Sequence, residues 1–229
     1  MGDLHGAYKA MIQCLSKAQF DYDRDTLIFL GDVADGWSQV PECIEEFLKI
    51  KNLVALKGNH DTWFENFLRS GEKPEEWLMQ GGVITVNAYR DRVNLISSHL
   101  KFLEKTLPYY LDEKKRLFVH AGFNPNLPVE KTDSPEEDYY WSREIFKRSF
   151  DGPVQPELYK EIYIGHTPTR GISDKPVNNH NVWLMDQGAA WEGFLSMMNI
   201  DSKEIYQSDR VPSLYPDEPG RRGLSKILF

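Results

Sequence analysis

The feature that most constrains the fold is a recurring junction, in which a short apolar run ends in a glycine-containing polar loop. The run 26–30 ends in a glycine and an aspartate, and the run 53–56 leads into Gly58-Asn59-His60-Asp61. Uninterrupted apolar runs of this length are typical of strands buried on both faces of a sheet. Segments with apolar residues at helical spacing, 7–18 and 40–50, precede the two runs. This alternation predicts right-handed crossovers and a mainly parallel first sheet.

Two later segments repeat the junction. Residues 117–122 and 161–166 each read as a strand that ends in a histidine beside a small residue or glycine. Further strands are predicted at 182–186 and 194–200, where the alternation of apolar and polar residues favours an antiparallel second sheet. Sites in α/β sheets gather at the carboxyl ends of the strands, so we expect the acidic and histidine-bearing loops to meet at one rim.

The length and the order of these elements predict a single α/β domain that spans residues 1–229. Residues 64–107 read as a helical insertion within it. Residues 208–229 are rich in proline, glycine and charge, which is typical of a C-terminal strap without a core of its own. The loop at 2–6 follows Met1 directly, so either a first strand is missing before it or the loop is held in another way.

The amino-acid composition narrows the possible binding partners of the protein and its expected cellular compartment. Lys and Arg number 27 against 35 Asp and Glu, which gives a net charge of -8, and basic residues occur only in short runs such as the pair Arg221-Arg222. This balance argues against a nucleic-acid or membrane partner. No apolar run reaches the length of a membrane span, and the N-terminus lacks the pattern of a secretion signal. Cys14 and Cys43 are expected to be buried free thiols, and the cytoplasm is the expected compartment.

Six side chains in these loops are of metal-binding types. Each is an oxygen or nitrogen ligand placed where an apolar run gives way to a glycine-containing turn: Asp3, His5, Asp32, Asn59, His120 and His166. Six such ligands around one rim match two divalent ions of intermediate hardness, and no thiolate is present to favour a structural zinc site. Asp32 is the predicted bridge between the two ions because its loop lies between the other two. Manganese, iron, zinc and cobalt all accept ligands of this kind.

Two dications with two carboxylates leave a net positive charge, which suits a phosphate ester. A metal-bound water or hydroxide is then the expected nucleophile, attacking phosphorus in line with the leaving group. His60 is not needed as a ligand and is the predicted general acid, with Asp35 holding its other ring nitrogen and keeping it protonated. Arg143 is the predicted fork for the non-bridging phosphate oxygens, and the alternative is an exposed helical arginine paired with Glu144 or Asp138.

The same residues resemble a known family. Five motifs look like those of the calcineurin-like metallophosphoesterases: Gly2-Asp3-Leu4-His5-Gly6, Gly31-Asp32 with Asp35, Gly58-Asn59-His60-Asp61, Val119-His120-Ala121-Gly122 and Gly165-His166-Thr167-Pro168. Their form is similar to the bacterial and phage branch of the phosphoprotein (Ser/Thr) phosphatase family, as are two further stretches, Trp141-Ser142-Arg143 and Asp186-Gln187-Gly188-Ala189. The resemblance covers residues 2 to about 190.

The resemblance implies a central β-sandwich of two mixed sheets flanked by helices, with the site at the carboxyl ends of the strands. It also implies a dimetal centre that is often active with manganese. On that basis one ion would be held by Asp3, His5 and Asp32, and the other by Asp32, Asn59, His120 and His166.

Two positions depart from the pattern of the family. Gly36-Trp37 stands where family phosphatases usually carry an arginine after the aspartate that corresponds to Asp35. Thr167-Pro168 follows His166, where many metallophosphodiesterases carry a further histidine ligand. The second departure fits the phosphatase branch, whereas the first means that one phosphate-binding side chain is absent or comes from elsewhere.

Three functions of different classes follow. The leading prediction is a phosphomonoesterase that acts on phosphoserine or phosphothreonine in proteins, and on small phosphate esters. Because no arginine stands beside Asp35, a second enzymatic function is the alternative: hydrolysis of a dinucleoside polyphosphate or a cyclic nucleotide. The third is a non-catalytic metal-binding scaffold, against which the intact His60 and the six ligands count.

Several polar and aromatic residues have a less specific interpretation. His99 is expected to be a surface or capping residue at the head of a helix, and His180 a turn residue. Packing is the favoured role for four tryptophans: Trp37, Trp63, Trp77 and Trp141. Asp186 either orients a metal-binding histidine or simply ends a strand.

Overall fold

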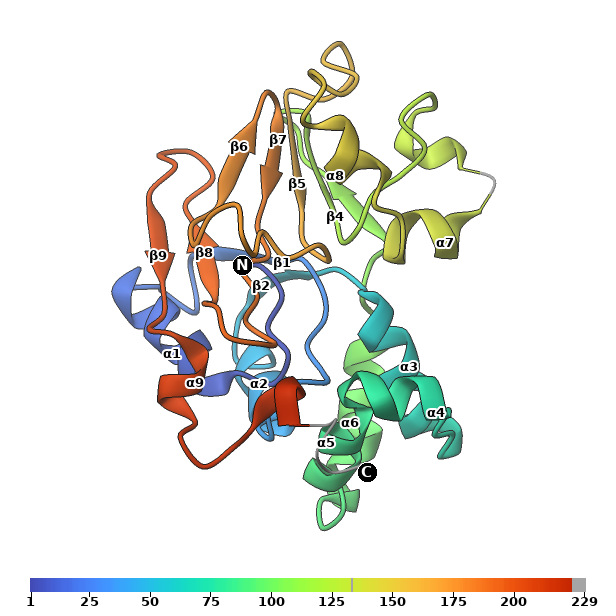
Figure 1. Cartoon of the computed structure of the whole chain (residues 1–229), viewed down its shortest axis with the longest axis vertical. Coiled ribbons are helices and arrows are strands. Elements are labelled where there is room, and N and C mark those ends of the chain that lie inside the picture. The colour runs from blue at the N-terminus through green and yellow to red at the C-terminus, as the bar shows by residue number, and fades with distance from the viewer. Residues whose placement is uncertain (133, 224–229) are drawn as a thin grey trace.

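The N-terminal half is built on a small parallel sheet of two strands, β1 (Thr26–Phe29) and β2 (Asn52–Ala55). Its helices are α1 (Tyr8–Lys17) and α2 (Val40–Phe47), whose apolar faces are buried in one cluster with Phe29. The computed structural model describes residues 1–132 and 134–223 (Figure 1). The order of strands and helices, and the parallel pairing of β1 with β2, confirm the prediction that the first sheet is parallel.

A five-stranded mixed sheet forms the second layer, in the order β3-β4-β5-β7-β6. Its strands are β3 (Tyr109–Leu111), β4 (Arg116–Val119), β5 (Glu161–Ile164), β6 (Val177–Asn179) and β7 (Val182–Leu184). The expectation of an antiparallel second sheet is wrong at its centre, because β4, β5 and β7 run parallel and only the two edge strands are antiparallel. The chain between β4 and β5 passes through helices α7 (Pro135–Tyr140) and α8 (Glu144–Arg148), and a crossover of that length permits parallel pairing.

A third pair of strands, β8 (Ser196–Met198) and β9 (Ile205–Gln207), is antiparallel. The first residues of the chain connect it to β1. The Met1 ammonium donates to the carbonyl oxygen of Ile28 (2.8 Å), Leu30 N–H donates to that of Met1 (3.1 Å), and Gly2 N–H donates to that of Ser196 (3.0 Å). These backbone hydrogen bonds hold the loop at 2–6 between the two small sheets.

The layers share an apolar interior. One buried cluster takes side chains from β4, β5 and the ends of β1, β2, β7 and β8: Leu30, Leu56, Phe118, Tyr163, Met185 and Met198. Because this cluster lies between strands of different sheets, it sets the distance between the loops that leave them. The prediction of a mixed α/β fold, with helices flanking the sheets, is confirmed.

Helices follow β2 directly and lie together at the lower right of Figure 1. They are α3 (Asn59–Ser70), α4 (Glu75–Trp77), α5 (Val83–Ala88) and α6 (Ile96–Leu103). The prediction for His99 is wrong, since this residue is fully buried within α6. Its ring lies 2.6 Å from the Tyr89 hydroxyl and 2.8 Å from a Glu45 carboxylate oxygen, so it ties α6 to α2 and to the residue after α5.

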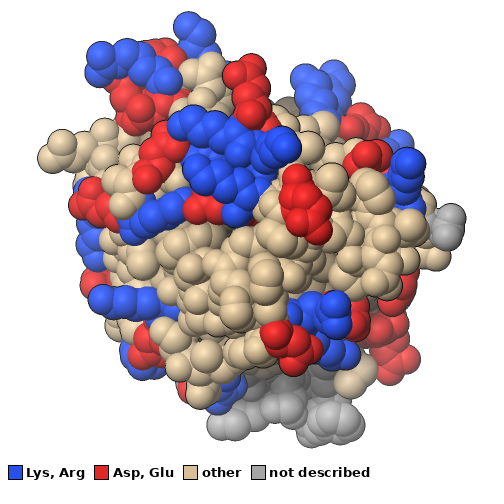
Figure 2. Space-filling model, turned by 90° about the horizontal axis from the view of Figure 1, so that it is seen from above, with Lys and Arg blue, Asp and Glu red and all other residues tan. Residues whose placement is uncertain are grey.

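The C-terminal part of the described chain contains α9 (Val211–Leu214) and a last helical turn, η4 (Gly220–Gly223). The remainder of the predicted strap, 224–229, lies outside the described residues. Cys14 and Cys43 are free and buried, as predicted. Among the described residues, no helix is both long and apolar enough to cross a membrane. On the face shown in Figure 2, basic side chains are bordered by acidic ones.

Candidate metal centre

The structure brings the predicted metal-binding side chains together at the ends of the strands. Two groups have ligand atoms within 4.8 Å of one another: Asp3, His5 and Asp32, and Asp32, His120 and His166. Asp32 belongs to both groups, which supports the predicted bridging position. The Oδ2 atom of Asp32 lies 3.7 Å from His5 Nε2 and 3.5 Å from His120 Nε2.

Asn59, the sixth predicted ligand, lies within the second group. Its side-chain oxygen is 3.1 Å from His120 Nε2 and 3.0 Å from His166 Nδ1. The other nitrogen of His120, Nδ1, lies 2.9 Å from the carbonyl oxygen of Leu30, so the ring is held with Nε2 facing the cluster. His5 is held in the same way, with Nδ1 at 2.7 Å from the Ala34 carbonyl oxygen. A backbone carbonyl on one ring nitrogen is a common way to aim the other at a metal.

The electrostatics of the cluster fit bound cations. Asp3 Oδ1 and His166 Nε2 are buried without a hydrogen-bond partner among the described residues. Burial raises the pKa of both Asp3 and Asp32 well above the ordinary value, and neighbouring carboxylates raise them further. Burial also lowers the pKa of His5 and His120, which keeps both rings neutral and able to act as ligands. Buried carboxylates and neutral imidazoles are stabilised when divalent ions bind between them.

Local backbone geometry is unusual at these positions. His5, Asp32, Asp35 and His166 all have positive φ, between 49° and 73°. Non-glycine residues rarely adopt this conformation, and its cost is met by the surrounding structure at functional sites. Gly165 serves the same cluster, because a Cβ at that position would lie 2.0 Å from Asp3 Oδ1. The glycines of the motifs thus make room for the carboxylates.

Asp61 has a structural role. Its carboxylate accepts hydrogen bonds from the backbone N–H groups of Asp32 (2.8 Å), Val33 (2.8 Å) and Gly58 (2.9 Å). It therefore caps α3 and also joins the loop after β1 to the loop after β2.

His60 and Asp35 form the predicted pair. His60 Nδ1 lies 2.8 Å from Asp35 Oδ2, and Asp35 also accepts hydrogen bonds from Trp77 Nε1 (2.6 Å) and from the Thr85 hydroxyl (2.6 Å). Burial raises the pKa of Asp35 to about 7. Burial, followed by the nearby Arg221 guanidinium, lowers the pKa of His60 well below its ordinary value. Asp35 thus fixes the orientation of the His60 ring. The expectation that Asp35 also keeps His60 protonated is opposed by burial, which favours the neutral imidazole.

Arg143 lies beside the cluster and remains exposed. Its Nε donates to the Thr167 hydroxyl at 3.3 Å, next to His166. Within the described residues it makes no ion pair with Glu144 or Asp138, which was the alternative. Helix α7 ends at Tyr140, and Arg143 is the residue before α8.

Asp186 lies two residues after β7 in a buried position and accepts a hydrogen bond from Gly188 N–H at 2.8 Å. Its negative charge contributes to the raised pKa of Asp3. Trp37 and Trp77 are fully buried, which confirms packing for these two. Trp63 and Trp141 are only half buried and contact each other edge to face, Trp63 beside His60 and Trp141 beside His166.

Arg221 is the residue that sequence reasoning missed. Its Nη2 lies 3.3 Å from His60 Nε2 and 3.0 Å from His5 Nδ1, and its Nε and Nη2 both donate to the backbone carbonyl of Asp35. The only sequence signal was its place in the one basic pair of the C-terminal strap. Nothing in that pattern connects residue 221 to a loop near residue 35.

Comparison with known proteins identifies the family. The sequence model described as calcineurin-like phosphoesterase matches residues 1–191. Serine/threonine-protein phosphatase 1 of Salmonella typhimurium is 24% identical over 208 residues, which cover 87% of this chain and 90% of that protein. The symmetrical bis(5'-nucleosyl)-tetraphosphatase of Neisseria gonorrhoeae is 23% identical over 261 residues, with 90% and 93% covered.

Solved structures agree on the fold. A proposed diadenosine tetraphosphatase has a TM-score of 0.65 at 15% identity, with 90% of both chains covered. A serine/threonine phosphatase of Saccharomyces cerevisiae has a TM-score of 0.63 at 15% identity, covering 96% of this chain and 81% of that one. The family match spans most of the chain and includes all six predicted ligands. The chain therefore belongs to the calcineurin-like phosphoesterase family, whose members use a dimetal centre, and it is a hydrolase of phosphoric esters.

Proposed function

We propose that this protein is a metal-dependent phosphomonoesterase of the Ser/Thr protein phosphatase type. The observation that carries the proposal is the His60–Asp35 pair, with 2.8 Å between Nδ1 and Oδ2, next to two metal-binding groups that share Asp32. Phosphate ester hydrolysis needs a cationic site for the phosphate and a proton for the leaving oxygen. This arrangement offers both within one buried rim.

Two divalent ions held by the six ligands would bind phosphate oxygens and lower the pKa of an attacking water. Manganese is the ion that we propose, and iron, zinc or cobalt suit the same donors. The residues of the chain have separate tasks. Asp35 fixes the ring of His60, and His60 would donate a proton from Nε2 to the leaving alkoxide once the ring is protonated. Arg143 is placed to contact a phosphate oxygen from the exposed side, next to His166.

Phosphoserine and phosphothreonine in proteins are the proposed substrates, and small phosphate esters would also be accepted. The Salmonella relative, named as a serine/threonine-protein phosphatase, supports this choice. Dinucleoside polyphosphate hydrolysis is the second candidate, and the relative named as a symmetrical bis(5'-nucleosyl)-tetraphosphatase supports it equally. The half-buried Trp63 and Trp141 beside the site favour this candidate, because an aromatic edge or face can contact a nucleobase.

One experiment separates these possibilities. Protein stripped with a chelator and refilled with manganese is assayed for hydrolysis of a phosphothreonine peptide and of a dinucleoside tetraphosphate. His60→Asn is compared with the parent, and His180→Asn, at an exposed position outside the site, is the matched control. We expect His60→Asn to lower kcat by roughly 100- to 10,000-fold, as for loss of a general acid, and His180→Asn to have no effect.

The outcomes are distinct. Preference for the peptide, lost in His60→Asn, supports the protein phosphatase. Preference for the nucleotide moves the function to polyphosphate hydrolysis and leaves the metal centre unchanged. Full activity of His60→Asn on both substrates would refute the general-acid role. Manganese binding without turnover of either substrate would refute both substrate assignments.

A further inference from the structure

The guanidinium of Arg221 reaches the candidate metal centre from the far end of the chain. It lies 3.3 Å from Nε2 of His60, the ring nitrogen that faces away from Asp35, and 3.0 Å from the ring of His5. It therefore stands between the proposed proton donor and one of the metal-binding groups. A leaving oxygen that takes its proton from His60 has to pass within reach of this guanidinium.

No carboxylate lies at ion-pair distance from Arg221 within 1–132 and 134–223. Its Nε and Nη2 donate to the Asp35 carbonyl oxygen, at 3.0 Å and 2.6 Å, and Nη1 has no hydrogen-bond partner in the same residues. Burial lowers its pKa, whereas the charges of Asp35, Asp32 and the other site carboxylates raise it. A buried arginine remains charged, and a charged guanidinium with a spare N–H edge has the geometry to bind phosphate oxygens.

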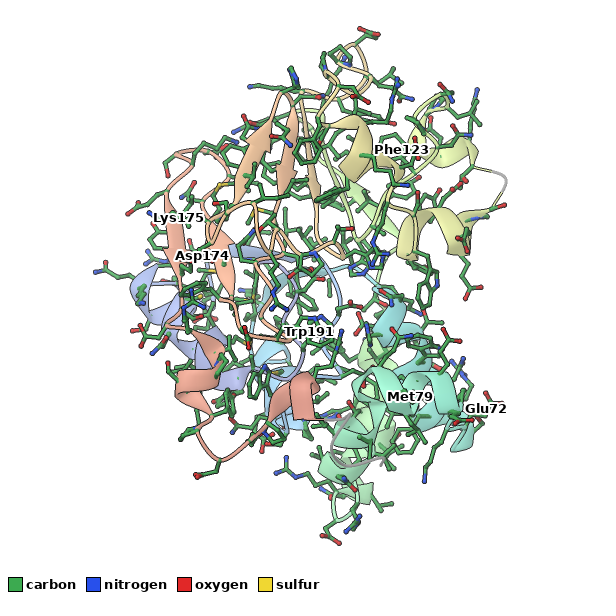
Figure 3. The ribbon with its side chains drawn as sticks, viewed as in Figure 1. Glu72, Met79, Phe123, Asp174, Lys175 and Trp191 are labelled. Carbon is green, nitrogen blue, oxygen red and sulfur yellow. The ribbon has the colours of Figure 1, made fainter. Side chains whose placement is uncertain are left out.

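The segment that carries Arg221 is fixed in place by the loop after Asp35. Tyr215 stacks on Trp37 with ring centroids 4.9 Å apart. Glu218 accepts two hydrogen bonds from Ser38, one from the backbone N–H (3.0 Å) and one from the hydroxyl (2.8 Å). The guanidinium also lies over the Trp191 ring, 5.2 Å from its centroid. Trp191 is labelled near the middle of Figure 3, where the strands meet the helices.

The same loop cannot supply a cation of its own. A Cβ at Gly36 would lie 2.6 Å from the His5 carbonyl oxygen and 2.7 Å from His5 Cβ, so any side chain at this position would clash with the backbone that holds the ligand. Trp37 follows, with its ring buried and its Nε1 donating to the Ala189 carbonyl oxygen at 2.8 Å. The loop after Asp35 therefore carries no arginine of its own at these two positions, and it holds in place the segment that supplies Arg221.

We propose that Arg221 is a substrate-binding residue that contacts the phosphoryl group, and that the segment from Tyr215 to Gly220 serves to deliver it. The inference rests on the proposed function, because it assumes that a phosphate ester occupies the rim of the metal centre. Arg221 and Arg143 would then approach the phosphate from two sides, the first half-buried and the second exposed.

The test uses the full chain loaded with manganese and measures binding as well as turnover. Arg221→Ala is compared with Arg221→Lys and with Arg210→Ala. Arg210 is an arginine of the same C-terminal segment that bonds to Asp174 and to the Glu192 carbonyl, outside the site. Binding of inorganic phosphate is measured by calorimetry, the manganese content by elemental analysis, and KM and kcat with p-nitrophenyl phosphate.

We expect Arg221→Ala to weaken phosphate binding and raise KM on the order of 10- to 100-fold, as for loss of charged hydrogen bonds. Manganese content should be unchanged. Arg221→Lys should retain only part of the phosphate binding because lysine lacks the planar fork. Millimolar guanidinium should partly restore phosphate binding to Arg221→Ala and should leave the parent unchanged. A weaker change in the same direction is expected for Ser38→Ala, which removes one of the bonds to Glu218.

Three results would overturn the inference. The first is unchanged phosphate affinity in a folded, manganese-loaded Arg221→Ala protein, which would make Arg221 a structural cation. The second is higher activity of that variant, which would make the segment a plug. The third is a parent protein that binds manganese but no phosphate. Failure of the proposed function looks different: phosphate would still bind through Arg221, but His60→Asn would leave turnover unchanged.

Discussion

The central residue of the proposed catalytic arrangement is Asp35, a buried carboxylate that contacts three other side chains. His60, Trp77 and Thr85 all lie within hydrogen-bond distance of it, and its own N–H donates to the Thr85 hydroxyl at 3.1 Å. Partners of this kind compensate for the loss of water around a buried carboxylate. The orientation of His60 therefore depends on residues that do not touch the substrate.

Thr85 allows this support to be tested. Thr85→Ala removes the hydroxyl that donates to Asp35 Oδ1, so we expect the free energy of unfolding to fall by about 1–3 kcal/mol. The measurement is urea denaturation of the metal-free protein. Thr85→Ser keeps the hydroxyl and should lose clearly less. Equal losses in the two variants would mean that packing of the methyl group, and not the hydrogen bond, is what Thr85 contributes.

At the scale of elements, the hairpin β8–β9 is connected to the five-stranded sheet by charged groups. Arg116 of β4 donates to Asp112 and to Asp201, both at 2.6 Å, and Asp201 lies in the turn between β8 and β9. Hydrogen bonds from Lys114 and Arg116 lower the pKa of Asp201 to about 2. The side chain of Asp201 is largely exposed, so its effect on stability is expected to be small.

The sign of its pH dependence follows from the lowered pKa. The native state favours ionised Asp201, so the contribution is fully present above the unfolded pKa of about 4 and is lost as the pH falls from there toward 2. We expect Asp201→Asn to lower the melting temperature slightly at pH 7, with a smaller difference from the parent at pH 3. The measurement is thermal denaturation of metal-free protein, with Asp91→Asn at an exposed position as control. A difference that is constant with pH would contradict this account.

At the scale of the whole molecule, the metal centre joins distant parts of the chain. The predicted ligands come from the N-terminal loop, from the loops after β1 and β2, and from those after β4 and β5. Ions that bind only the folded state stabilise it, by about 2.7 kcal/mol when the free ion is at 100 times its Kd. Chelation is therefore expected to loosen the contact between the loops that carry these ligands.

This coupling gives a prediction for metal removal. We expect manganese to raise the melting temperature of the parent in a concentration-dependent way, and EDTA to reverse the rise. Asp32→Asn should remove most of the effect and most of the bound metal, because Asp32 belongs to both groups. His166→Asn belongs to one group and should keep about half of the metal. Full metal content in Asp32→Asn would show that this residue does not bridge two ions.

The sequence by itself determined the first sheet and the meeting of the candidate ligands. Apolar runs that end in glycine and a charged residue carry their own geometry, since a buried strand must leave the core where its polar residues begin. The meeting of Asp3, His5, Asp32, Asn59, His120 and His166 followed from the rule that such loops share the carboxyl edge of a sheet. The pairing of His60 with Asp35 was predicted for the same reason.

Only the tertiary structure decided the features that depend on contacts between segments without a common pattern. Strand direction in the second sheet depends on how the chain between β4 and β5 crosses over, which local alternation does not encode. The burial of His99 depends on Tyr89 and Glu45 from neighbouring helices. Arg221 reaches the site because Tyr215 and Glu218 are held by Trp37 and Ser38. Such contacts arise from packing between distant residues, and no local period in the sequence reports them.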